Sequence, residues 1–128
     1  SGFRFNGGVN NCTETIFYME TGDVQVGGNS TNTFKAPTSG AYTNLLIYLP
    51  SGNSSPVDVV GVSGSQIWGS IIAVSSNVKL TGNNNSDGLH TQIISDTIDF
   101  IGNGTTKIIF DTHVPDPDPA SPAIEFTD

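Results

Sequence analysis

Three short segments of the chain repeat one pattern, and this repeat constrains the possible folds more than any other feature. Each segment alternates, with apolar side chains at its second and fourth positions, and each closes on Gly-Asn. They are residues 23–29, 77–83 and 97–103. An internal repeat of this size is typical of stacked arrays, in which each repeat supplies one structural unit that only its neighbours can bury.

The repeated segment belongs to a longer unit. A short apolar strand precedes each copy, and two copies are followed by a further strand after the Gly-Asn corner. The preceding strands are residues 16–19, 71–74 and 93–94, and the following ones are 33–36 and 107–110. Gly82 and Gly102 are 20 residues apart, which is about one coil of a three-faced parallel β-solenoid.

The first two copies are separated by enough chain for one additional coil. Its strands are expected at residues 45–49 and 57–62, with a corner at 51–53 and a lead into the next coil at 66–70. We therefore predict an all-β fold: a parallel β-helix of about four coils over residues 1–112, with an irregular start at residues 3–5. We expect the corner glycines to provide positive φ angles, which glycine adopts without strain.

An antiparallel β-sandwich is the main alternative, because its turns recur every 8–12 residues and Gly-Asn is also turn chemistry. The recurrence of the whole strand–corner–strand block, rather than of a turn alone, favours the solenoid. No stretch shows the 3.6-residue period of an amphipathic helix.

Residues 113–128 differ in composition from the repeat region. Pro115, Pro117 and Pro119 alternate with acidic residues, and prolines at this spacing exclude a regular helix or strand. We expect an extended, acidic, polyproline-like tail that ends in a short strand with Ile124 and Phe126. Such a tail is expected to pack on its own solenoid or to add as a strand to a neighbouring copy.

Composition excludes several functions. The formal net charge is −8, and the chain has only four lysine and arginine residues. Nucleic acids and anionic membranes require a basic patch, so neither is an expected partner. No apolar run approaches the roughly 20 residues of a transmembrane helix, so we expect no membrane insertion. Cys12 is the single cysteine, which rules out an internal disulfide and leaves a buried thiol or an intermolecular bridge.

Two other segments resemble a known family. Residues 36–42, and residues 67–73 with their later partner 91–97, are similar to the Gly/Asn-rich β-solenoid domain of exported bacterial proteins associated with tight-adherence (Flp-type) pilus assembly loci. The resemblance covers roughly residues 16–110. It implies an extracellular or cell-surface location and a non-enzymatic role, and it supplies no catalytic residues.

Parallel β-helices also host polysaccharide lyases and hydrolases, which require a base and a cation or a pair of carboxylates. No spacing in the sequence pairs the titratable residues into such a site: Asp58, Asp87, His90, Asp96, Asp99 and His113. We expect no catalytic residues and no cofactor. Asp116 and Asp118, or residues 83–87, offer oxygen ligands for calcium, but neither matches a known calcium motif, so no metal site is expected.

Two further sets of side chains could bind or carry sugars. Five Asn-x-Ser/Thr triplets are possible glycosylation sites, most of them at predicted exposed corners, although chains rich in Asn, Ser and Thr also produce such triplets by chance; they begin at Asn11, Asn29, Asn53, Asn84 and Asn103. The aromatic residues Tyr18, Tyr42, Tyr48 and Trp68 could form a sugar-stacking platform, but packing at the core or at a sheet edge is the expected role.

The sequence leaves two functional hypotheses open. A solenoid has two open ends, and head-to-tail contacts that do not close produce a fibre. The first hypothesis is therefore a self-assembling extracellular structural protein, with copies of itself as partner and exchange of the tail strand. The second is a monomeric cell-surface adhesin that displays its corners to glycans.

Overall fold

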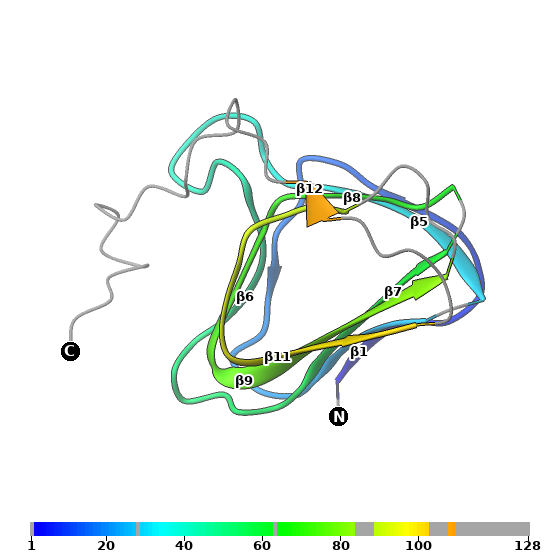
Figure 1. Ribbon diagram of the computed structural model, residues 1–128. Helices are drawn as coiled ribbons and strands as arrows, with labels where there is room; N and C mark the ends of the chain where they lie inside the picture. Colours follow the sequence, from blue (N-terminus) through cyan, green and yellow to red (C-terminus); the bar gives the residue numbers. More distant parts are fainter. Residues whose placement is uncertain (1, 28, 63, 84–88, 103–107, 110–128) are drawn as a thin grey trace.

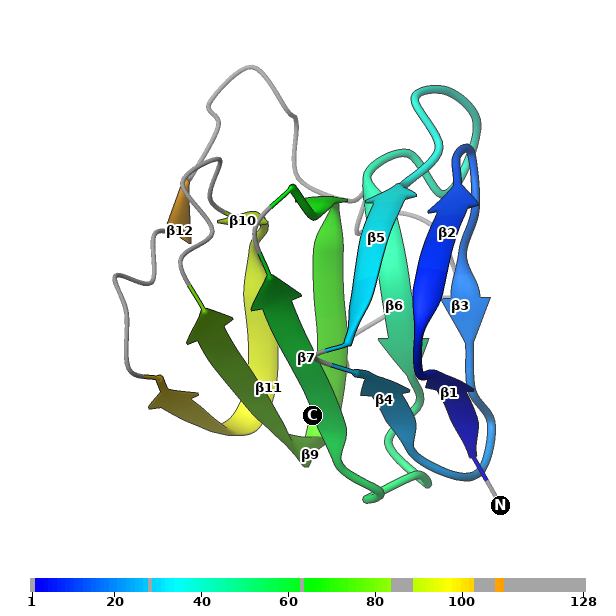
Figure 2. The same ribbon diagram turned by 90° about the vertical axis from the view of Figure 1, so that its right-hand side faces the viewer.

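The computed structural model describes residues 2–27, 29–62, 64–83, 89–102 and 108–109. The paired strands among these residues run parallel, and the chain winds in three-sided coils around one core (Figure 1). Seen from the side, the coils stack one beside the next, with β1 and β11 at opposite ends (Figure 2). The predicted β-solenoid of about four coils is confirmed.

Face 1 of the solenoid carries the sequence repeat. It contains β1 (Phe3–Phe5), β4 (Val24–Val26), β7 (Val57–Val62), the second part of β9 (Ser70–Asn83) and the second part of β11 (Ile93–Ile101). The registers join Val24 to Val57, Val57 to Val78 and Val78 to Ile98. The three repeated segments therefore stack in one sheet, and β7 supplies the additional coil that we expected between the first two copies.

The other two faces complete each coil. Face 2 contains β2 (Gly8–Cys12), β5 (Ser30–Lys35), β8 (Gln66–Trp68), β10 (Leu89–His90) and β12 (Ile108–Ile109). Face 3 contains β3 (Phe17–Tyr18), β6 (Leu45–Leu49) and the first parts of β9 and β11. Because β9 and β11 continue around a corner, faces 1 and 3 form a single sheet.

Strand alternation explains the core. Successive side chains of a strand point to opposite faces of the sheet, so every second residue of each coil points inward. On face 1 the inward residues Val24, Val57, Val78 and Leu80 are at most 1% exposed. The outward position between Val57 and Val59 is the charged residue Asp58, which is consistent with a sheet that is solvated on its outer side.

The first strand departs from our expectation of an irregular N-terminal start. Phe3, Arg4 and Phe5 pair in register with Val24, Gln25 and Val26, so β1 is a regular rung of face 1. The sequence did not reveal this strand as a copy of the repeat for two reasons. The strand has only three residues, and Asn6-Gly7 follows it where the other copies have Gly-Asn.

The reason for glycine in the repeat also differs from the prediction. Gly61, Gly82 and Gly102 occupy one column at the end of face 1, and none of them has a positive φ. A Cβ atom added at Gly102 would overlap the carbonyl oxygen of Gly82. At position 102 glycine is therefore required because adjacent backbones approach too closely for a side chain, and not because the turn is left-handed.

Residues 113–128, for which we predicted an extended tail, lie outside the described residues. The described strands, from β1 to β12, form one solenoid, and the boundary predicted at residue 112 also lies outside the described residues. No helix in the described ranges is long and apolar enough to cross a membrane.

Candidate assembly interface

The N-terminal end of the core is filled by aromatic rings. Phe3, Phe5 and Phe17 come from two faces of the first coil, and Phe34 comes from the second coil. The centroid of the Phe5 ring is 4.7 Å from that of Phe34 and 5.8 Å from that of Phe17, and Phe3 lies 4.8 Å from Phe5. Phe34 is fully buried, whereas the three rings of the first coil are only partly buried.

The opposite end of face 1 exposes the same inward column. Ile98 and Phe100 are in register with Val78 and Leu80, which are completely buried. Ile98 is nevertheless 41% exposed and Phe100 56% exposed. Both side chains point to the inner side of the sheet, where the core lies in the other coils. They are exposed at the end of face 1, where β11 is the last described strand.

Both terminal rungs are sheet edges in the described part of the chain. The strand β1 pairs only with β4, and the second part of β11 pairs only with β9. One side of each strand therefore carries backbone N–H and C=O groups without a ladder partner among the described residues. Such edges are templates for pairing with another strand unless a protein covers them.

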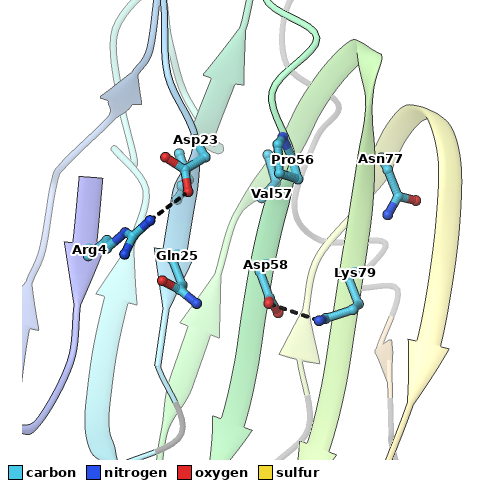
Figure 3. Close-up of a pocket in the computed structure, with 9 residues that line it drawn as sticks. Arg4, Asp23, Gln25, Pro56, Val57, Asp58, Asn77 and Lys79 are labelled. Carbon is cyan, nitrogen blue, oxygen red and sulfur yellow. Dashed lines mark ion pairs between the residues drawn. The ribbon is translucent and has the colours of Figure 1, made fainter. Parts of the chain in front are cut away.

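The outer side of face 1 carries a column of polar and charged residues. From the N-terminal end the in-register order is Arg4, Gln25, Asp58, Lys79 and Asp99. Lys79 Nζ lies 3.0 Å from Asp58 Oδ2, across one rung (Figure 3). Arg4 Nη2 lies 3.5 Å from Asp23 Oδ2, and Asp99 accepts a hydrogen bond of 3.2 Å from Asn77 Nδ2.

With the exception of Asp99, these side chains line a pocket of about 220 Å³ between the two ion pairs (Figure 3). Its walls combine Arg4 and Lys79 with Asp23 and Asp58, so neither sign of charge dominates. The Oδ1 atom of Asp58 is buried and accepts no hydrogen bond from the described residues. The pocket therefore offers charged groups of both signs to a small polar molecule, whereas the Oδ1 atom of Asp58 is too buried to contact one.

The four aromatic residues considered as a sugar platform do not lie together. Trp68 is on face 2, where its ring stacks on His90 with centroids 4.0 Å apart and Lys35 Nζ lies 5.6 Å from its centroid. Tyr18 and Tyr48 stack on face 3, with centroids 5.5 Å apart. Because His90 and Lys35 already contact the indole, the geometry favours edge packing for Trp68 over a free stacking surface.

Burial affects one of these tyrosines. Desolvation raises the pKa of the Tyr48 hydroxyl above its ordinary value, and the adjacent Tyr18 adds to the shift in the same direction. The neutral phenol is therefore the form that this stack favours.

The titratable residues considered for catalysis are dispersed. Asp58 and Asp99 lie on the outer side of face 1, Asp96 lies at the corner where the register of β11 shifts, and His90 stacks on Trp68. The described ranges contain no group of three or more His, Cys, Asp or Glu residues that could hold a metal ion. Asp87, His113, Asp116 and Asp118 lie outside the described residues.

One of the five possible glycosylation sites is buried. Asn53 is 4% exposed, and its Nδ2 donates hydrogen bonds to the carbonyl oxygens of Met19 and Gly22. A glycan would have to replace this packing. Asn11 and Asn29 are exposed, while Asn84 and Asn103 lie outside the described residues.

Sequence reasoning missed a buried polar ladder on face 2. Asn32 is completely buried; its Oδ1 accepts a hydrogen bond from Asn10 Nδ2 at 2.9 Å, and its Nδ2 donates to Ser30 Oγ at 2.9 Å. The backbone N–H of Asn32 donates to Ser65 Oγ. The sequence could have indicated this burial, because Asn32 lies two residues before Phe34 on the same strand and alternate residues of a strand point to the same side.

Cys12 lies at the end of β2 in the first coil, where it is partly buried and packs against the core. The residues of the predicted assembly tail, Pro115, Pro117, Pro119, Ile124 and Phe126, lie outside the described residues. Comparison with protein-family models, with curated proteins and with solved structures found no match to the chain.

Proposed function

We propose that this protein is an extracellular structural protein whose solenoids stack end to end into a surface filament. The observation that carries the proposal is that, among the described residues, both ends of face 1 present a strand edge without a partner, beside apolar inward side chains. Phe3 and Phe5 occupy one end and Ile98 and Phe100 the other. Contacts between two different ends of identical subunits do not close on themselves, and they generate an open fibre.

Burial of the two ends supplies the driving force for such stacking. Apolar surface contributes about 25 cal/mol per Å² removed from water, and a parallel rung adds backbone hydrogen bonds of about 1 kcal/mol each. A formal charge of −8 on each copy opposes association, so specific contacts at the junction must exceed this repulsion.

The surface location is supported by composition and by the resemblance to pilus-associated solenoid domains. Few charged residues and many Asn, Ser, Thr and Gly residues suit a rigid rod with polar corners. Labelling of intact producing cells with a membrane-impermeant reagent tests the location. Labelling only after lysis would contradict it.

Sedimentation velocity over a wide range of protein concentrations, with electron microscopy of the same samples, tests assembly. We expect species that grow with concentration and appear as filaments of uniform width. A single monomeric boundary at every concentration would overturn the proposal.

The tail has its own test, because residues 113–128 lie outside the described residues. If strand exchange by the tail holds the filament together, deletion of residues 114–128 abolishes the filaments. Unchanged filaments after this deletion would reject the tail mechanism and leave end-to-end stacking intact.

A monomeric adhesin is the second candidate, and the pocket on face 1 favours it. The pocket combines the cationic donors Arg4 and Lys79 with the carboxylates of Asp23 and Asp58. If it binds neutral glycans, the protein retains them on a glycan array while it remains monomeric, and Asp58→Asn reduces retention. Gln25→Ala, at the rim of the same pocket, should have a smaller effect.

A further inference from the structure

We propose a specific register for the junction: Arg4 of one copy lies beside Asp99 of the next, in continuation of the outward column on face 1. This inference rests on the proposed end-to-end assembly and names its partner surface. In this arrangement, β1 of a second copy pairs with the exposed second part of β11.

The registers within one copy define the geometry. Arg4, Gln25, Asp58, Lys79 and Asp99 occupy successive rungs of a single column. The flanking inward columns run from Phe3 to Ile98 and from Phe5 to Phe100 over the same rungs. If the free edge of the next β1 adds to β11 as one more parallel rung, the next Phe3 covers Ile98 and the next Phe5 covers Phe100.

Charge complementarity selects this register. Within the copy, Asp58 and Lys79 already form an ion pair across one rung, at 3.0 Å. The column ends on Asp99 at one end and begins on Arg4, whose side chain is 64% exposed, at the other. The proposed junction therefore places opposite charges on adjacent rungs. A displacement by two residues would instead place Gly2 or Asn6 beside Asp99.

The apolar surface agrees with the same register. Ile98 and Phe100 are about half exposed although their column neighbours Val78 and Leu80 are completely buried. At the other end, Phe3 and Phe5 are only partly buried. One additional strand at the junction covers both sets of apolar side chains. The β1 strand of a second copy fits this position, because its Phe3 and Phe5 point to the inner side, as Ile98 and Phe100 do.

Reversal of charge gives a sharp test. In Arg4→Asp alone, two carboxylates meet at each junction, and in Asp99→Arg alone, two guanidinium groups meet. We expect each variant to assemble about tenfold more weakly than the wild type. A mixture of the two in equal amounts restores opposite charges at every mixed junction, so it should form alternating filaments at wild-type concentrations.

Gln25→Asp is the control for position, since it introduces a carboxylate, as Arg4→Asp does, into the same column but at an interior rung. Circular dichroism establishes that each variant is folded before mixing. The mixture also separates folding from assembly, because a misfolded variant cannot be rescued by an opposite charge on another chain.

Cross-linking measures the register without altering the charge pair. In a Cys12→Ser background, cysteines at Asn6 and Ile101 lie on adjacent rungs of the proposed junction, so oxidation should give covalent ladders of linked copies. Cysteines at Gln25 and Ile101 are the control, because no junction brings an interior rung to the end.

The outcomes distinguish the two proposals. Assembly of the wild type together with rescue by mixing and ladders from the 6–101 pair supports the register. Assembly of the wild type without rescue or without those ladders overturns the register and leaves the filament. A wild type that remains monomeric at all concentrations overturns the proposed function itself.

Discussion

Asn53 Nδ2 donates a hydrogen bond of 2.9 Å to the carbonyl oxygen of Met19, which joins the second coil of the solenoid to the first. The same nitrogen donates to the carbonyl oxygen of Gly22 at 3.0 Å, and the Asn53 carbonyl accepts a hydrogen bond from Ser76 Oγ in the third coil. One corner residue thus ties three successive coils, at a place where the strand ladders are interrupted.

Replacement of this residue should weaken the solenoid. Asn53→Ala leaves two carbonyl oxygens without their donor and opens space at a buried corner, so we expect the free energy of unfolding to fall by about 1–3 kcal/mol. Denaturant titration followed by circular dichroism measures this. Asn11→Ala, at an exposed site in another Asn-x-Ser/Thr triplet, should change stability by less than about 0.5 kcal/mol. Equal effects of the two substitutions would contradict the role of Asn53.

Glycine substitutions should separate backbone conformation from close packing. Gly69 has a φ of 141°, and an added Cβ would lie 2.7 Å from both Ala36 Cβ and Leu46 Cβ. Gly40 has a φ of 92° with open space around it, and Gly52 has open space without a positive φ.

We expect Gly52→Ala to be nearly neutral, Gly40→Ala to destabilise by about 1 kcal/mol, and Gly69→Ala to destabilise by several-fold more. Thermal unfolding of the three variants gives the order. A Gly69→Ala protein as stable as the Gly40→Ala protein would show that the corner between β8 and β9 can relax.

The stack of His90 on Trp68 should be visible in fluorescence, because Trp68 is the single tryptophan of the chain. The two rings are nearly parallel, with an interplanar angle of 14°. His90→Ala removes the cover from one side of the indole, so its emission should shift to longer wavelength. Lys35→Ala should give a smaller shift, since Nζ is 5.6 Å from the ring centroid. Identical spectra for wild type and His90→Ala would exclude the stack in solution.

Stability at alkaline pH should depend on Tyr48. The folded protein raises the pKa of this hydroxyl, mainly by desolvation. The unfolded chain therefore releases the Tyr48 proton first, near the ordinary pKa of about 10, and the folded state loses stability as the pH rises above that value. Unfolding titrations between neutral and strongly alkaline pH measure the decline. Tyr48→Phe should decline less steeply, and an unchanged slope would assign the effect to other groups.

The architecture was predictable because the repeat records it directly. Alternation in residues 77–83 and 97–103 identifies the inward columns, and the 20-residue spacing identifies the coil. The role of Gly102 was not predictable, since a glycine required by a close backbone approach and a glycine required by positive φ look the same in a sequence. The burial of the corner residue Asn53 was not predictable either, because it depends on Met19 and Gly22 of another coil.

The candidate interface was predictable only in part. Open ends follow from any solenoid, but the order of charges along a column requires the registers between coils. Arg4 and Asp99 are far apart in sequence, and the irregular 33-residue offset between β4 and β7 hides their shared column. No spacing rule relates the two residues without the pairing of all intervening strands.

Leu80 and Phe100 share one column but differ in exposure, so they should separate folding from assembly. Leu80 is completely buried, and Leu80→Ala should lower the free energy of unfolding by about 2–5 kcal/mol through the cavity it leaves. Phe100 is 56% exposed, so Phe100→Ala removes fewer contacts from the isolated chain and should destabilise it much less. In an end-to-end filament, however, Phe100 becomes as buried as Leu80, and its loss should raise the concentration needed for assembly by at least tenfold. Unfolding of dilute protein measures the first effect, and sedimentation of concentrated protein measures the second. A Phe100→Ala protein that assembles like the wild type would show that this rung does not lie at a junction.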